Sequence, residues 1–167
     1  MTAVRTMADA DAELVAKVLT VSDGVVAGTR EDRSGTALVE RLAGAGFTVV
    51  GRSVVADGRE NVGEAIVGMA AGFHGLLVTT GGTGFGPRDL TPEGTRIVLD
   101  RSAPGLAEAM RAVHPLGRLS RGVCGTRGGT LVLNTPGSPK GAVECLEAVL
   151  DVVPHALQLM RGESGGH

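Results

Sequence analysis

The sequence predicts an α/β protein, a three-layer α/β/α sandwich in which helices cover both faces of a mostly parallel sheet. Strand-like and helix-like segments alternate along the 167 residues, which is typical of βαβ units. The segment 75–80 is short, apolar and flanked by glycines, as expected of a strand buried on both faces. Aromatic residues make up only 2% of the chain. The core must therefore consist of Val, Leu, Ile and Ala, which suits helices packed closely on a parallel sheet.

The first half of the chain is expected to supply two strands and two helices. Residues 13–21 form a mostly apolar run that stops at a polar turn, which predicts the first strand. Ser34 is the expected N-cap of a helix that runs to about Ala45. Residues 47–56 are rich in β-branched side chains and predict the second strand. Apolar side chains then recur with helical spacing at Val62, Ala65, Ile66, Met69, Ala70 and Phe73.

The second half begins with a glycine loop after the buried strand. Thr91 is the expected N-cap, with Pro92 as the first helical residue, of one or two helices that run to about Val113. Ser138-Pro139 repeats this arrangement before a last helix, which Pro154 is expected to kink. Between these helices a strand pair is predicted at 122–126 and 130–134.

One domain is expected over residues 13–162, because 167 residues leave little room for a second. The sequence shows no internal repeat and no interdomain linker. The segments 1–12 and 163–167 are expected to be flexible tails.

Composition argues against several classes of partner. The net charge of −2 gives no general reason to expect nucleic acid, and the chain lacks the aromatic platforms on which single strands stack. No apolar run approaches the ~20 residues that cross a bilayer, and residues 1–12 do not resemble a signal peptide. We therefore expect a cytoplasmic protein without nucleic-acid or membrane partners. Cys124 and Cys145 are expected to be buried thiols.

Polar, glycine-rich segments follow the predicted strands, where ligands bind in open α/β sheets. The chain has 27 glycines, about twice the ordinary share of ~7%. Glycine loops bring backbone N–H groups close to an anion, and helix N-termini add a favourable dipole. The sequence therefore predicts a polyanionic ligand. Arg88, Arg121, Arg127 and Lys140 are the candidate cations, and the segments are 22–24, 57–58, 81–89 and 134–139.

Familiar signatures of other sites are absent from the sequence. It has no GxxxxGK[ST] motif, and the GxG at 82–84 lacks the third glycine of a dinucleotide fingerprint. The four histidines have no zinc-site spacing, and no GxSxG elbow is present. A P-loop NTPase, a zinc enzyme and an acyl hydrolase are therefore disfavoured.

Asp57 and Asp89 should face the same crevice. An unpaired carboxylate near phosphates is repulsive unless a cation joins them, and Mg²⁺ binds through one or two carboxylates plus substrate phosphates. Two structural explanations stay open on the residues alone. Asp57 could cap a helix N-terminus, and Asp89 could pair with Arg88.

Several motifs match a known family in order and spacing from about residue 14 to 160. They are LTVSD at 19–23, DRSG at 32–35, TGGTG at 80–84 with RDLTPE at 88–93, PG at 104–105, LSR at 119–121 and NTPGSP at 134–139. Together they resemble the MogA/MoaB family of molybdenum-cofactor biosynthesis. The segment from TGGTG to TPE is the most specific.

The resemblance implies a molybdopterin-binding, MogA-like fold in which molybdopterin and Mg-ATP meet. The implied reaction is adenylylation of molybdopterin, in which its terminal phosphate attacks the α-phosphorus of ATP. The products are adenylyl-molybdopterin and pyrophosphate. Mg²⁺ is expected with ATP as co-substrate, and no tightly held organic cofactor is expected.

The family's two functional aspartates map onto Asp57 and Asp89, so the resemblance implies that both are catalytic and bind Mg²⁺ with the substrate phosphates. A side chain at Gly82 is expected to fill the space that the phosphates need. Gly129 stands where several relatives carry a polar residue, which implies one missing substrate contact. The implied substrate- and nucleotide-binding residues are Ser22, Asp23, Ser34, Gly35, Gly81, Gly82, Thr83, Gly84, Arg88, Ser120, Arg121, Pro136, Gly137, Ser138 and Pro139.

The resemblance also implies a homotrimer and a downstream partner, the molybdenum-insertion enzyme. Two alternatives to the enzyme are a non-catalytic molybdopterin carrier and an assembly partner of that insertion enzyme. A MogA-type or MoaB-type role, and a molybdenum or tungsten pathway, are equally compatible with the motifs.

Overall fold

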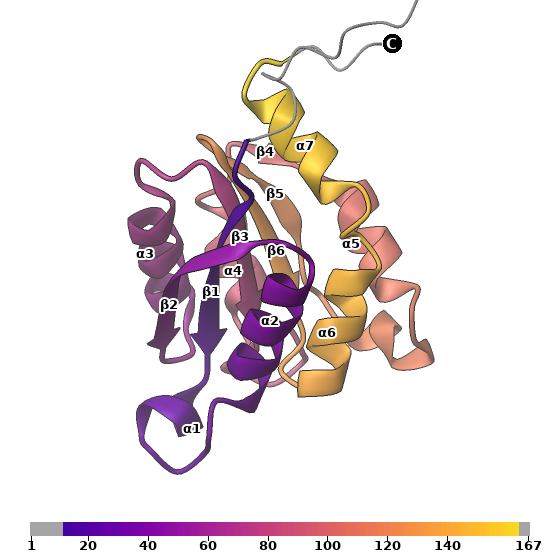
Figure 1. Ribbon diagram of the computed structural model, residues 1–167. Coiled ribbons are helices and arrows are strands. Elements are labelled where there is room, and N and C mark those ends of the chain that lie inside the picture. The colour runs from indigo at the N-terminus through magenta and orange to yellow at the C-terminus, as the bar shows by residue number, and fades with distance from the viewer. Residues whose placement is uncertain (1–11, 164–167) are drawn as a thin grey trace, which may run out of the picture.

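The computed structural model describes residues 12–163, so the tails predicted at 1–12 and 163–167 lie almost wholly outside the described residues. A six-stranded sheet with the order β2-β1-β3-β6-β5-β4 forms the centre of the molecule (Figure 1). Four strands are parallel: β2 (Thr48–Val55), β1 (Val15–Val21), β3 (Gly75–Thr80) and β6 (Thr130–Thr135). Two antiparallel strands complete one edge: β5 (Cys124–Arg127) and β4 (Arg101–Ser102).

Helices cover both faces of this sheet, which confirms the three-layer prediction (Figure 1). Alternate residues of β3 point to opposite faces: Leu76 and Val78 join the larger apolar cluster, whereas Leu77 joins the smaller one. The larger cluster is covered by α2 (Arg33–Gly44), α5 (Pro104–Arg111), α6 (Pro139–Glu147) and α7 (Val153–Met160). The smaller is covered by α3 (Arg59–Ala70), against which α4 (Thr91–Arg96) packs. Two short helices, α1 (Asp23–Val26) and η2 (Pro115–Leu119), belong to the connections.

The five predicted strands agree closely with the structure, whereas β4 lies within the stretch predicted as helical up to about Val113. Two helix caps were also predicted at the wrong residue. The side chain of Asp32, not Ser34, caps α2, because its carboxylate accepts the N–H of Gly35 at 3.0 Å. Leu90 occupies the cap position of α4. Thr91 points inward instead, where its buried hydroxyl donates to the carbonyl of Gly81.

The predicted last helix is two helices, α6 and α7, separated by a turn at 148–152. Pro154 lies in the first turn of α7 and does not kink a continuous helix. A proline in the first turn loses no hydrogen bond, since the N–H groups there have no partner within the helix.

Gly129 lies in the hairpin between β5 and β6, where its carbonyl accepts the N–H of Gly75 at the start of β3. A Cβ at this position would overlap the ring of His74. The hairpin is at the amino ends of the parallel strands, opposite the polar loops. A side chain at Gly129 therefore does not make the substrate contact that the resemblance implied.

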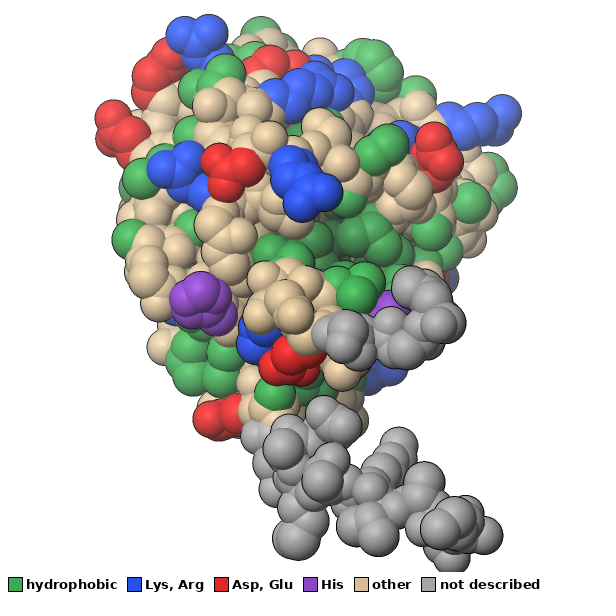
Figure 2. All heavy atoms as spheres, turned by 90° about the horizontal axis from the view of Figure 1, so that it is seen from above, with side chains coloured by type: hydrophobic (Ala, Val, Ile, Leu, Met, Phe, Trp, Pro, Cys, Tyr) green, Lys and Arg blue, Asp and Glu red, His purple; other side chains and the backbone are tan. Residues whose placement is uncertain are grey.

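Both cysteines are free and buried, as predicted. Burial raises the pKa of Cys124 to about 12 and also raises that of Cys145. Within residues 12–163, no helix has the length and apolar character needed to cross a membrane. Figure 2 shows the molecule from the top of Figure 1, where acidic and basic side chains stand beside one another on the described surface.

Candidate active site

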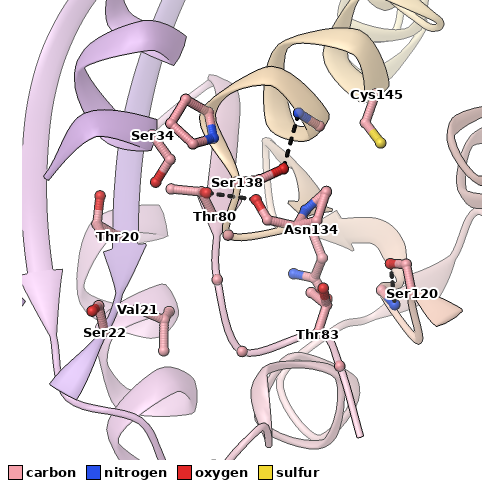
Figure 3. A pocket seen from close by; sticks show the side chains of 18 of the residues that line it. Thr20, Val21, Ser22, Ser34, Thr80, Thr83, Ser120, Asn134, Ser138 and Cys145 are labelled. Atoms are coloured by element: carbon pink, nitrogen blue, oxygen red, sulfur yellow. Dashed lines mark hydrogen bonds between the residues drawn. The ribbon is translucent and has the colours of Figure 1, made fainter. Parts of the chain in front are cut away.

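A cavity of about 1110 Å³ opens beyond the carboxyl ends of β1, β3 and β6, at the lower end of the sheet in Figure 1. In Figure 3, Thr20, Ser22 and Ser34 lie on one side of this pocket and Ser120 on the other. The strand ends thus place the cavity where the sequence predicts a ligand. Thirteen predicted site residues line it: Ser22, Ser34, Asp57, Gly81, Gly82, Thr83, Gly84, Asp89, Ser120, Pro136, Gly137, Ser138 and Pro139.

Backbone contacts hold the glycine loop after β3 in place. Gly81 and Gly82 have φ angles of 100° and 68°, which side chains with a Cβ rarely adopt. A Cβ on Gly81 would overlap the carbonyl oxygen of Val21, and one on Gly82 would overlap Oγ1 of Thr91. Thr91 fixes both glycines, because its Oγ1 donates to Gly81 O at 2.9 Å and its N–H to Gly82 O at 3.0 Å. The loop is therefore a rigid wall of the cavity.

Asp57 does not cap α3, because Gly58 is the cap residue and makes no side-chain hydrogen bond. Oδ2 of Asp57 instead accepts the N–H of Asp23 at 3.0 Å, and the N–H of Asp57 donates to Oδ1 of Asp23 at 3.1 Å. This reciprocal pair joins the ends of β1 and β2. Burial raises the pKa of Asp57, and the negative charges of Asp23 and Asp89 add to the effect.

Asp89 does not pair with Arg88. Nε of Arg88 instead donates to Oδ2 of Asp23 at 2.6 Å, and this hydrogen bond lowers the pKa of Asp23. Oδ2 of Asp89 accepts the N–H of Gly86 at 2.9 Å. Among the described residues, Oδ1 of Asp57 and Oδ1 of Asp89 accept no hydrogen bond from the protein. Two carboxylates with one available oxygen each thus line the same cavity.

The burial of Asp57 leads to a prediction about stability. A carboxyl group whose pKa is raised on folding is neutral in both states below its ordinary value of 3.8. Above that value the unfolded chain ionises first, so folding stability falls as the pH rises, until the folded carboxyl also ionises. Asp57→Asn should therefore be more stable than the wild type at neutral pH. The difference should vanish below the ordinary pKa.

Thermal unfolding between pH 3 and pH 8 measures this difference. Asp151→Asn, at an exposed position, is the matched control and should follow the wild type throughout. A lower melting temperature for Asp57→Asn at pH 8 would contradict the prediction. It would show that the buried carboxylate stabilises the fold.

Four predicted binding residues lie outside the cavity lining: Asp23, Gly35, Arg88 and Arg121. Asp23 and Arg88 form the ion pair described above. Gly35 allows close packing, because a Cβ there would overlap the Asp32 carboxylate and lie 2.5 Å from Oγ1 of Thr20. Arg127, a candidate cation, donates to Val98 O near the antiparallel edge of the sheet and is likewise outside the lining.

Part of the cavity lining was not predicted from the sequence. It comes from α5, η2 and residues of α6 beyond its first turn, and it includes the cation Arg111. Nη1 of Arg111 donates to Gly122 O at 2.9 Å. Neither α5 nor η2 follows a parallel strand, so the rule that locates ligands at strand ends gave no signal for them. The missed lining residues include Met110, Arg111, His114, Leu116 and Cys145.

Two hydroxyl groups at strand ends and two cations near them also line the cavity and were not predicted from the sequence. Thr20 and Thr80 are the last or next-to-last residues of their strands, and both line the cavity. Arg30 reaches it from the loop before α2, Arg33 from the first residue of α2, and the predicted cation Lys140 from α6. These cations favour a ligand with several negative charges.

The fold and the cavity define an α/β protein in which a glycine loop, several cations and two carboxylates line one cavity at the strand ends, an arrangement suited to a phosphate-bearing ligand. A family model described as a probable molybdopterin binding domain matches residues 17–155. The chain belongs to this family, as its motifs predict.

Individual relatives extend this result. The molybdopterin adenylyltransferase of Helicobacter pylori strain J99 is 38% identical over 152 residues, which cover 87% of this chain and 86% of the relative. The molybdopterin biosynthesis enzyme MoaB from Thermus thermophilus has a TM-score of 0.83 and 49% identity, over 90% of this chain and 98% of that one. For the Mog protein of Mycobacterium ulcerans the TM-score is 0.81 and the identity 41%, over 88% and 99% of the two chains.

Proposed function

We propose that this protein transfers the adenylyl group of ATP to molybdopterin in molybdenum-cofactor biosynthesis. Membership of the molybdopterin-binding family and 38% identity to an enzyme named molybdopterin adenylyltransferase support this activity. The observation that carries the proposal is the pair Asp57 and Asp89. Each uses one oxygen to accept a backbone N–H and leaves the other available in one cavity beside the glycine loop.

These two carboxylates fit Mg²⁺. The described residues contain no cluster of three or more His, Cys, Asp or Glu side chains that could hold a metal. They do offer two carboxylate oxygens beside a loop suited to phosphates, and Mg²⁺ characteristically binds in that way. Asp57 and Asp89 would hold the ion together with the substrate phosphates. There it would neutralise charge on the phosphoryl group in transfer.

The chain's own contribution is to position the two substrates and balance their charge. The N–H groups of the glycine loop and of the first turn of α6 are suited to phosphate oxygens, and Ser138 fixes that turn by accepting the N–H of Gly141 at 3.1 Å. Arg30 and Lys140 add positive charge at the cavity. An oxygen of molybdopterin's terminal phosphate bonds to the α-phosphorus of ATP, and the bond from that phosphorus to the β-bridging oxygen breaks. Its electron pair leaves with pyrophosphate.

The test is a pyrophosphate assay with purified protein, molybdopterin, ATP and Mg²⁺. We expect pyrophosphate release that requires all three small molecules and stops when Mg²⁺ is chelated. Tight molybdopterin binding without pyrophosphate would overturn the proposal in favour of the carrier. A stable complex with the molybdenum-insertion enzyme, again without turnover, would favour the assembly partner.

The resemblance also predicts a homotrimer and docking on the molybdenum-insertion enzyme, and the composition predicts a cytoplasmic location. These stay predictions. Sedimentation of the purified protein checks the first, and a pull-down with the insertion enzyme checks the second.

A further inference from the structure

Arg121 lies outside the cavity lining, and it contacts the loop 83–90, which carries Asp89, and the helix after that loop at four places. Its backbone N–H donates to Thr83 O at 2.9 Å, and Nε donates to Gly84 O at 2.7 Å. Nη2 donates to the carbonyl of Asp89, and Nη1 pairs with Glu93 in the first turn of α4. One residue thus holds the loop before Asp89, at Asp89 and after it.

The loop that Arg121 holds contributes little packing of its own. Residues 85–88 are exposed, and Phe85 is 70% exposed. The Asp89 carboxylate is fixed within this loop only by the N–H of Gly86. Because so little of the loop is buried, its conformation depends on hydrogen bonds from outside. Arg121 supplies four such contacts from the segment that leads into β5, and Arg88 adds others to Asp23 and to the carbonyl of Asp57.

The chemistry of the guanidinium suits this task. Its planar fork presents donors in fixed directions, so a single side chain can bind two carbonyl groups and a carboxylate at once. The ion pair is strong enough to lower the pKa of Glu93, chiefly through the hydrogen bond from Arg121. A lysine has one compact ammonium group and cannot reach the three acceptors together.

We propose that Arg121 is a positioning residue that sets the place of the Asp89 carboxylate, and that it does not contact substrate. The inference rests on the proposed function in one respect, since it takes Asp89 as the residue whose position matters for the reaction. The effect of Arg121 on the conformation of the loop is independent of any enzymatic activity. The two claims can therefore fail separately.

The first experiment measures amide hydrogen exchange across residues 83–90 in full-length protein without substrates. In Arg121→Lys we expect exchange in this segment to rise about tenfold or more, with unchanged exchange in β1 and β3. Glu93→Gln removes the negative charge from one of the four contacts but keeps an acceptor oxygen, so it should give a smaller rise. Arg118→Lys is the matched control, because Arg118 donates to Pro115 O within its own short helix. It should leave the loop unchanged.

The second experiment measures the kinetics of the same variants. Arg121→Lys should lower kcat by about 10- to 100-fold, the size expected of a displaced catalytic group. It should leave KM for molybdopterin unchanged and require more Mg²⁺ for half-maximal rate. Unaltered exchange at 83–90 would overturn the inference, as would a raised KM for molybdopterin with normal kcat. If the wild type releases no pyrophosphate, the proposed function fails and the exchange data still decide the role of Arg121.

Discussion

Asp89→Asn should lower pyrophosphate release by about 10²- to 10³-fold, the loss typical when one group that stabilises transition-state charge is removed. The asparagine oxygen can still accept the N–H of Gly86, which holds Oδ2 of Asp89 at 2.9 Å in the wild type. The loop should therefore keep its shape. What disappears is the negative charge and the oxygen available to Mg²⁺. Molybdopterin affinity should stay unchanged, because the carboxylate serves the metal and the phosphates rather than the pterin.

Asp100→Asn is the matched control for this variant. Asp100 likewise accepts a loop N–H, that of Gly128, at 2.7 Å, and it is not part of the cavity lining. Steady-state pyrophosphate release and equilibrium molybdopterin binding should both be normal in the control. Normal turnover in Asp89→Asn would remove this residue from the mechanism. A parallel loss of molybdopterin affinity would assign it to substrate recognition instead.

The sequence predicts strands and their polar ends well because both have local signals. Buried parallel strands are apolar runs, and the loops that follow them carry Gly, Asp and Ser. For that reason the predicted β3 segment, 75–80, has the bounds found in the structure. The same rule placed Asp57, Asp89 and the glycine loop at one cavity. Both predictions need only the local sequence and the order of the strands, and no knowledge of contacts between distant residues.

Side-chain roles set by distant partners could not be predicted in this way. Ser34 and Asp32 are both good helix caps, and the choice between them depends on Thr20 in β1. Its hydroxyl donates to the Asp32 carboxylate at 2.9 Å. Arg121 is 32 residues from Asp89 in sequence, and its motif does not show whether the guanidinium faces substrate or backbone. The unpredicted part of the cavity lining has the same origin, because α5 and η2 reach the site through tertiary packing.

The glycine loop provides the other large effect. Gly82→Val should destabilise the protein by about 3 kcal/mol, combining the strain of a positive φ with the disruption of a buried hydrogen bond. The φ angle of Gly82 is 68°. An added Cβ would overlap Oγ1 of Thr91 and lie 3.2 Å from Oδ1 of Asp57. Turnover should fall as well, because Thr91 holds the loop and Asp57 supplies a carboxylate.

The structure gives a different reason for the loss caused by Gly82→Val from the one that the sequence indicates. The glycine-loop motif suggests that a side chain at Gly82 fills the space of the phosphates, in which case damage should grow with side-chain size. In the structure, however, the Cβ itself would already overlap Oγ1 of Thr91, so the clash does not depend on a larger side chain. Gly82→Ala should therefore cause most of the loss in stability that Gly82→Val causes.

Urea unfolding of both variants and of Gly68→Ala separates the two explanations. Gly68 is in α3 with no atom within 4 Å of an added Cβ, so its replacement should stabilise the helix by up to about 1 kcal/mol. A stable Gly82→Ala protein with normal ATP affinity, beside a Gly82→Val protein that has lost ATP binding, would restore the space-filling explanation. Similar destabilisation in both variants means that Gly82 is required to hold Thr91 and Asp57 in place.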